Sequence, residues 1–334
     1  MEILCVDTLI HQINACVEGY LRQENIHFTG DDFERLNAAY AKNKHYSTGV
    51  NLSHAPQRGL YVACRMPATT AVMQQIFAQL PADFLPETLC DLGGGSGSAV
   101  VAAGKRFPAL TDVTIVDENP HLLCLAELFF PLLAPQINVR TRILSYVTGT
   151  VSGAYDLVTL SYTLNEIPES CRELVVTKAW HMCKGMLVIA EPGSPKGFDV
   201  IMQIRDWACK HNIHVYAPCS HHGQCPLRVG DWCHFHARFP RSTRLRQLKG
   251  ASLGYEDEPY SYLVLSRQEY PPQGMRIIEK PRKFPHGLTI KTCSPEHVHT
   301  HPIRKKNPLY KSLKKSKRGD LYQGPITRSL VPAT

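Results

Sequence analysis

Three cysteines and four histidines stand together in the stretch APCSHHGQCPLRVGDWCHFHARFPR, residues 217–241. The cysteines, Cys219, Cys225 and Cys233, are spaced C-x5-C-x7-C, which is wider than the short loops of zinc ribbons. Thiolates bind metal ions, and three of them in one polar loop repel one another unless a cation neutralises them. We therefore expect a metal site here. Three free thiols, or zinc bound in part by the histidines, are alternatives that the spacing leaves open.

A metal centre of this kind needs a fourth ligand from elsewhere in the chain. Cys209 lies in an expected helix beside Ile204 and Trp207, which is the setting of a core residue. Cys293 ends the strand-like segment LTIKTC and precedes Ser-Pro, so its side chain can face a loop. We predict Cys293 as the fourth ligand.

A second pattern that could do chemistry is CDLGGGSGS, residues 90–98. Gly93, Gly95 and Gly97 follow Asp91 as G-x-G-x-G, and Asp117 ends the next expected strand. Glycines let the backbone approach a ligand closely at a helix N-terminus, and an acid after the second strand can accept the hydroxyls of a ribose. The arrangement predicts a cofactor that contains a nucleoside.

The glycine spacing discriminates between two such cofactors. The dinucleotide motif G-x-G-x-x-G needs glycine at position 98, where this chain has Ser98. G-x-G-x-G after an acid resembles class I S-adenosylmethionine-dependent methyltransferases, in which the first acid lies near the methionine moiety and the second binds ribose. We therefore favour S-adenosylmethionine over NAD. A tight turn that has lost its ligand is the remaining alternative.

In that fold, the residues that follow the fourth strand face the transferred methyl group. The candidates in YDLVTLSYTLNEIP are Ser161, Tyr162, Asn165 and Glu166. The segment lacks N-P-P-Y, which is typical of base amino methylation, and it lacks a cysteine nucleophile. Methyl transfer can depend on proximity and orientation alone, so this composition neither proves nor excludes catalysis. Strand-end packing or helix capping is an equal alternative for each residue.

Positive charge is concentrated in two blocks of a chain whose formal net charge is +8. Residues 303–318 hold eight Lys and Arg and no acid, and residues 238–249 add four Arg and one Lys. Such blocks typically bind a polyanion, most simply RNA, although a solvated tail that aids solubility is the alternative. The residues predicted to contact RNA are Arg238, Arg241, Arg244, Lys305, Lys306, Lys314 and Lys315.

The elements that must position these residues change along the chain. Helical spacing of apolar residues predicts a helical N-terminal part, whose third helix covers 67–80 with Pro67 in its first turn. Short apolar runs then alternate with helices, which predicts an α/β fold with a parallel, doubly wound sheet. No apolar run is long enough for a membrane span. The expected organisation is a helical region at 1–80, a Rossmann-like core at 81–212, a cysteine-rich metal-binding insertion at 213–258, the last core strands at 259–295 and a basic tail at 296–334.

Five segments together resemble one protein family. They are RMPAT (65–69), DLGGGSG (91–97), the APC…CPL…WCHF…R-x-P-R series (217–241), EDEPYSYLVL (256–265) and PRKFPHGLTIKTC (281–293). This is the methyltransferase-like family associated with the small ribosomal subunit, which has bacterial-type and mitochondrial members. Pro259, where the family pattern has lysine, and the RGD at 318–320 depart from it without touching a predicted ligand.

The resemblance implies a [4Fe-4S] cluster on Cys219, Cys225, Cys233 and Cys293, with zinc as the alternative. It implies binding to small-subunit ribosomal RNA and to the pre-ribosomal small subunit, by either a methyltransferase or a non-catalytic assembly factor that keeps the fold. We expect the cluster to be structural, because no site for an electron-transfer partner is evident. A small-molecule methyltransferase is a third hypothesis, which predicts no salt-dependent affinity for RNA. The start MEILCVDTLIHQ lacks signal-peptide and transit-peptide features, so we expect a cytoplasmic protein that is monomeric off the ribosome.

Overall fold

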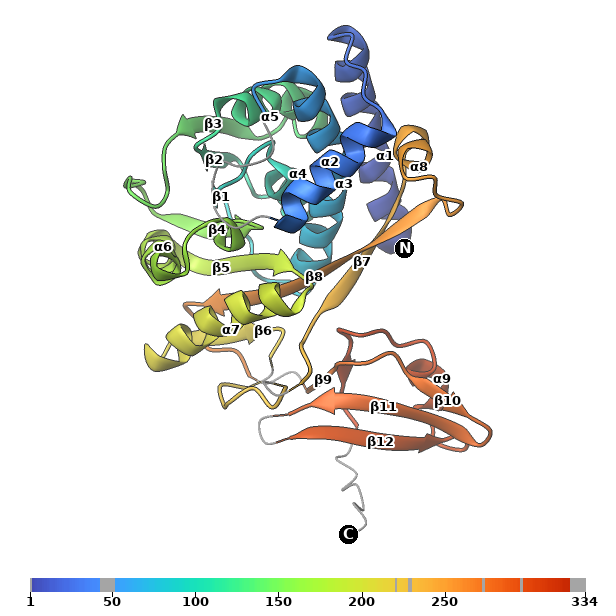
Figure 1. Ribbon diagram of the computed structural model, residues 1–334. Helices are drawn as coiled ribbons and strands as arrows, with labels where there is room; N and C mark the ends of the chain where they lie inside the picture. Colours follow the sequence, from blue (N-terminus) through green and yellow to red (C-terminus); the bar gives the residue numbers. More distant parts are fainter. Residues whose placement is uncertain are drawn as a thin grey trace.

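Two sheets of unequal size organise the chain (Figure 1). The computed structural model describes residues 2–42, 52–219, 221–227, 230–271, 274–294 and 297–324. A large mixed sheet has helices on both faces, and a smaller antiparallel sheet lies beyond the end where β6 and β7 join it.

Three helices precede the large sheet: α1 (Glu2–Gln23), α2 (Gly30–Lys42) and α3 (Ala55–Phe77). The helix expected over 67–80 begins much earlier, so Pro67 lies inside α3 and not in its first turn. Leu60, Val62 and Met66 are buried in the turns that precede Pro67. Burial of these side chains stabilises those turns by more than the hydrogen bond that proline removes.

The large sheet confirms the predicted doubly wound, mostly parallel architecture. Its strands are β1 (Thr88–Leu92), β2 (Asp112–Asp117), β3 (Asn138–Ile143), β4 (Tyr155–Ser161), β5 (Cys183–Pro192), β6 (His214–Ala217), β7 (Phe235–Pro240) and β8 (Tyr255–Ser266). The order is β3-β2-β1-β4-β5-β8-β6, with the first five strands parallel. Strand β8 is antiparallel to β5 and also pairs with β6 and β7.

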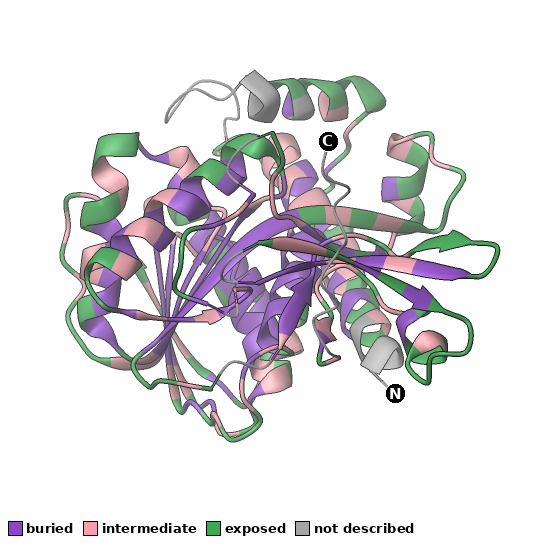
Figure 2. Cartoon of the chain, turned by 90° about the horizontal axis from the view of Figure 1, so that it is seen from below, coloured by how far each residue is buried: buried purple, intermediate pink, exposed green. Residues whose placement is uncertain are grey.

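Both faces of the large sheet are covered by helices, as the apolar strands require. The covering helices are α4 (Ser98–Arg106), α5 (Pro120–Leu133), α6 (Glu169–Met182) and α7 (Pro195–Lys210). Alternation along β5 decides the faces: Val188 packs with α1, α3, α4 and α5, whereas Ile189 packs with α6 and α7. Figure 2 shows the resulting buried core along the strands and the inner helix faces. None of the described helices combines the length and apolarity that a membrane crossing needs.

Residues 213–258 are more closely integrated into the core than an insertion would be. Strands β6 and β7 both pair with β8, and the short helix α8 (Thr243–Leu248) follows β7. The segment between β6 and β7 carries the cysteines. The large sheet therefore fixes both ends of the cysteine segment.

The region expected to supply the last core strands and a basic tail is arranged differently. After β8, the strands β9 (Met275–Ile277), β10 (Arg282–Phe284), β11 (Gly287–Cys293), β12 (Val298–Arg304) and β13 (Leu321–Tyr322) form a separate sheet, with α9 (Tyr310–Leu313) before β13. Its own apolar core includes Ile277, Leu288 and Ile303. Alternating burial along β12 buries Ile303 and leaves Arg304 exposed, so the start of the predicted basic tail is part of a folded sheet.

One arginine side chain forms hydrogen bonds between the second sheet and the rest of the protein. Arg276 in β9 is 6% exposed. Its Nε donates to the carbonyl of Pro218 (2.7 Å), and its Nη1 donates to Gln79 Oε1 (3.0 Å) and to the carbonyl of Gly319 (2.6 Å). The side chain therefore joins the segment after α3, the start of the cysteine segment and the second sheet.

Replacing this arginine should loosen the contact between the sheets. Arg276→Met leaves one buried and two partly buried acceptors without their donor, so we expect the free energy of unfolding to fall by about 3 kcal/mol in urea denaturation. Arg282→Met is the matched control, because that side chain is 74% exposed and its ion pair within the described residues is with the nearby Glu279. The control should change stability by less than about 0.5 kcal/mol. Equal effects of the two substitutions would contradict this role of Arg276.

Candidate functional site

The turn after β1 has a backbone that requires glycine. Gly93, Gly95 and Gly97 have φ angles of 70°, 51° and 80°, in the left-handed region. A Cβ atom at Gly93 would lie 2.7 Å from Thr163, and one at Gly97 would lie 2.5 Å from the Phe130 ring. At Gly95 the nearest atom, Leu122 Cδ1, would be 3.4 Å away, which is an ordinary van der Waals contact, so at this position the φ angle is what requires glycine.

Two predicted acids flank the turn and are used differently. Asp117 at the end of β2 accepts the N–H groups of Gly95 and Asn119, both at 2.8 Å, and so fixes the turn. Asp91 is fully buried, and its Oδ1 accepts a hydrogen bond from Thr159 Oγ1 at 2.6 Å. Its Oδ2 has no partner among the described residues. Burial raises the pKa of Asp91 to about 7, so a cation bound beside this carboxyl would stabilise its ionised form.

The residues after β4 are largely engaged with other parts of the protein. Ser161 is half-buried at the end of β4. Tyr162 has a φ of 59°, lies under the Arg65 guanidinium, and has a buried hydroxyl that finds no partner in the described residues. Asn165 Nδ2 donates to Glu191 Oε2 (2.7 Å). These contacts hold the turn in place. They do not identify a residue that would face the molecule that accepts the methyl group.

Three ionisable groups near this turn extend the site beyond the sequence prediction. Glu191 at the end of β5 is fully buried and accepts the N–H of Leu164 at 2.8 Å. Burial raises the pKa of Glu191 to about 8, and burial together with the charge of Asp117 raises that of Glu166 to about 7. Arg65 Nη1 lies 3.0 Å from Glu258 Oε1. Glu191 could have been predicted from the sequence, because it is an acid at the end of the apolar segment LVIAE. The pairing of Arg65 with Glu258 could not, because the two residues are 193 positions apart.

The structure brings the four predicted cysteine ligands into one neighbourhood. Cys225 and Cys293 are buried in an apolar cluster with Phe198 and Met202 of α7, and Cys233 packs against it. Burial, followed by the charge of Cys219, raises the pKa of Cys293 to about 12 and that of Cys233 well above its usual value. The thiol of Cys219 contributes to the raised pKa of both Cys233 and Cys293. Residues from the two sheets thus meet at this point.

This neighbourhood is not a preformed metal centre. Across the described ranges, no group of three or more His, Cys, Asp or Glu side chains is arranged to hold a metal ion. A single zinc ion would hold four sulfurs about 2.3 Å from one point. The fold therefore brings the thiols near one another, but it does not hold them at the distances from one point that a single zinc ion needs.

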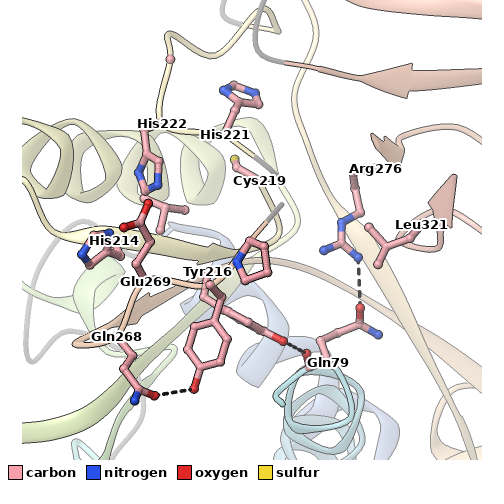
Figure 3. Close-up of a pocket in the computed structure, with 14 residues that line it drawn as sticks. Gln79, His214, Tyr216, Cys219, His221, His222, Gln268, Glu269, Arg276 and Leu321 are labelled. Carbon is pink, nitrogen blue, oxygen red and sulfur yellow. Dashed lines mark hydrogen bonds between the residues drawn. The ribbon is translucent and has the colours of Figure 1, made fainter. Parts of the chain in front are cut away.

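A pocket of about 280 Å³ opens beside the cysteine segment. In Figure 3, Cys219 and His221 lie on one side of the pocket, and Arg276 and Leu321 lie across from them. The rings of His214 and His222, 6.0 Å apart, contribute a further part of the lining. The pocket gives small ligands access to the Cys219 side of the segment and is separate from the glycine turn.

The predicted RNA contacts fall into two groups. Three arginines form ion pairs: Arg238 with Asp257 (2.7 Å), Arg241 with Glu256 (3.2 Å) and Arg244 with Glu18 (2.9 Å). The four lysines, in contrast, are exposed in the segment between β12 and β13, and none forms an ion pair in the part of the chain that the structure describes: Lys305, Lys306, Lys314 and Lys315. The lysines therefore present positive charge that is not neutralised locally.

The strand order and the turn define the class of protein. A sheet in which one antiparallel strand, β8, is inserted before the last of six parallel strands, with a glycine turn after β1 and an acid at the end of β2, is the class I methyltransferase fold. Within that class, the chain belongs to the Rsm22 family. The sequence model described as "Mitochondrial small ribosomal subunit Rsm22" matches residues 57–323. The suspected family relationship is thereby confirmed.

Similar curated proteins agree with this assignment. The human "Ribosome assembly protein METTL17, mitochondrial" is 25% identical over 320 residues, which are 86% of this chain and 66% of that protein. The "Rsm22-cox11 tandem protein 1, mitochondrial" of Schizosaccharomyces pombe is 26% identical over 242 residues, which are 64% of this chain and 32% of that protein. The chain thus spans just under two thirds of the human relative and about a third of the yeast one.

Solved structures with related folds are more distant. Magnesium protoporphyrin IX methyltransferase from Synechocystis with bound SAH has a TM-score of 0.41 and 15% identity, covering 77% of this chain and 100% of that chain. An O-methyltransferase family protein from Burkholderia thailandensis has a TM-score of 0.44 and 18% identity, covering 78% of this chain and 72% of that one. Both TM-scores are low, so the fold assignment depends on the strand order.

The expected cytoplasmic location is wrong. The family description and the names of the curated relatives specify mitochondria. The expectation rested on the composition of residues 1–12 alone, which does not determine a compartment.

The buried carboxyl of Asp91 should make stability depend on pH. Its folded-state pKa of about 7 lies above its ordinary value of 3.8, so the folded state binds the proton more tightly. Without a ligand, the stability from this group is present below about pH 4 and is lost as the pH rises to about 7, on the order of 4 kcal/mol. Asp91→Asn should remove this part of the pH dependence in urea denaturation at pH 4.5 and 7.5. The same slope in both proteins would contradict the assignment.

Proposed function

We propose that this chain binds S-adenosylmethionine at the glycine turn, carries a [4Fe-4S] cluster on Cys219, Cys225, Cys233 and Cys293, and acts on or binds small-subunit ribosomal RNA during ribosome assembly. The match of the family model over residues 57–323 is the observation that carries the ribosomal part. The names of the human and yeast relatives, both mitochondrial, support the same setting for this chain.

The glycine turn fits S-adenosylmethionine in two respects. The unpaired Oδ2 of Asp91 can accept a hydrogen bond from the ammonium group of the methionine moiety. Asp117 uses one lone pair of each oxygen on backbone N–H groups, which leaves acceptor capacity for ribose hydroxyls. The cofactor would supply an electrophilic methyl group, and this chain would orient it.

The cysteine neighbourhood fits a cluster better than a single ion. Three of the four thiols share one apolar cluster, and Cys219 packs at the edge of the neighbouring core, yet the thiols are not arranged around one point. An iron–sulfur cluster separates its cysteine ligands by its own iron and sulfide atoms, so it needs wider spacing. The buried guanidinium of Arg205, which lies near these thiols, also favours a centre whose net charge is negative.

A non-catalytic assembly factor is the second candidate function. Asn165 is committed to Glu191 and Tyr162 lies under Arg65, so neither side chain is displayed to an acceptor. Under this alternative, the fold and the basic sheet would bind the ribosomal particle without transferring a methyl group.

Calorimetry tests cofactor binding through Asp91. A bound cation favours the ionised carboxyl, so affinity for S-adenosylmethionine should rise roughly fivefold from pH 6 to about pH 7.5, before the amino group of the cofactor itself loses its proton. Asp91→Asn should bind more weakly and lose this dependence, whereas Asp112→Asn, at the exposed start of β2, should behave like the wild type. Absence of binding at both pH values would reject the cofactor.

Mass spectrometry of small-subunit ribosomal RNA then separates the two candidate functions. A strain that lacks the protein should lose one methylated nucleotide if the chain is an enzyme. Unchanged modification together with defective small-subunit assembly would favour the assembly factor.

Iron and sulfide analysis of anaerobically purified protein tests the metal centre. Four iron and four sulfide atoms are expected per chain for a [4Fe-4S] cluster. Cys293→Ser should lose the cluster, because it removes a ligand. Cys209→Ser should keep it, because the Cys209 thiol is directed to the carbonyl of His222. Stoichiometric zinc without iron would overturn the cluster.

The salt dependence of RNA binding tests the exposed lysines. Each double substitution, Lys305→Ala with Lys306→Ala or Lys314→Ala with Lys315→Ala, should reduce the slope of log K against log salt by about 1.4 for single-stranded RNA. Arg238→Ala with Arg244→Ala should reduce it by less than half of that, since both arginines are already paired with acids. Equal reductions would show that the ion-paired arginines also contact RNA.

A further inference from the structure

A buried arginine faces the cysteine segment without a carboxylate partner. Arg205, in the middle of α7, is 2% exposed. Its Nη2 donates to the carbonyls of His221 (2.9 Å) and Gly223 (2.7 Å), while its Nε has no hydrogen-bond partner in the described residues. Within those residues, it forms no ion pair with an acid. Burying a cation in this way is costly unless negative charge is supplied nearby.

A histidine lies between this arginine and a predicted cluster ligand. The His221 ring is 6% exposed; its Nδ1 lies 3.5 Å from Arg205 Nη2, and its Nε2 lies 3.7 Å from Cys293 Sγ. A hydrogen on Nδ1 would point toward the guanidinium. With Nδ1 as the acceptor of the guanidinium N–H, a neutral ring would carry its hydrogen on Nε2, directed at the sulfur of Cys293.

We infer that Arg205 and His221 form a relay that donates a hydrogen bond to the Cys293 sulfur and raises the reduction potential of the cluster. The inference rests on the proposed function, because it requires the cluster. An N–H donor stabilises the reduced state, in which the sulfur carries more negative charge, and the buried guanidinium acts in the same direction. Arg205 and His221 are positioning residues, since neither is a ligand.

The relay differs from a role in holding the loop. Arg205 would hold the loop through the carbonyls of His221 and Gly223 alone, and the His221 ring would then be replaceable by any ring of similar size. The relay instead requires an N–H group at Nε2. A readout at the cluster itself therefore separates the two explanations.

A redox titration of the full-length protein with its cluster tests the relay. His221→Phe keeps a buried ring but removes the donor, so the equilibrium constant for one-electron reduction should fall about tenfold, equivalent to about 59 mV toward lower potential. His221→Gln retains an N–H donor and should recover part of the change. The matched control is His222→Phe, because the His222 side chain is exposed at the neighbouring position. Equal potentials in wild type, His221→Phe and His222→Phe would overturn the inference.

A measurement on the wild type covers the case in which His221→Phe does not assemble. Electron–nuclear double resonance of the reduced cluster in protein with ¹⁵N-labelled histidine should show coupling to one histidine nitrogen and to its exchangeable proton. Absence of both couplings in a protein that holds four irons would reject the relay and leave the proposed function intact. A wild type that takes up no iron would instead reject the cluster, and the relay with it.

Discussion

Burial of the Arg276 guanidinium is the constraint on which the relative placement of the two sheets depends. Its donors are satisfied by Gln79, Pro218 and Gly319, which belong to three distant parts of the chain. A buried guanidinium cannot release these acceptors without leaving polar groups unpaired. Because Pro218 directly precedes Cys219 and β9 lies beside the end of β11, this one side chain keeps the cysteine segment facing Cys293.

The two candidate sites have opposite electrostatic characters. At the carboxyl ends of the parallel strands, Asp91 and Glu191 are buried acids whose pKa values burial raises. At the cysteine neighbourhood, Arg205 and Arg276 are buried cations. A sulfonium cofactor with an ammonium group suits the first environment, and a negatively charged centre suits the second. The proposed ligands thus match the charge that each site lacks.

The sequence predicted what depends on local pattern. Alternating strands and helices gave the doubly wound sheet, and the glycines after Asp91 marked the turn that the structure places between β1 and α4. The second sheet was missed because β9 and β10 have three residues each, too few for a period to be recognised, and because their pairing depends on distant segments. The pairing of Arg244 with Glu18 was equally inaccessible, since it joins residues that are 226 positions apart.

The pairing of β9 with β13 makes the second sheet a closed loop of chain. Arg276 pairs with Leu321 and Met275 with Tyr322, so β10, β11, β12 and Cys293 all lie between two segments that must find each other. Closing this loop of chain carries an entropy cost, which the strand pairing and the apolar core of the second sheet must offset. Any group that binds only the closed loop shifts the folding equilibrium toward closure by mass action.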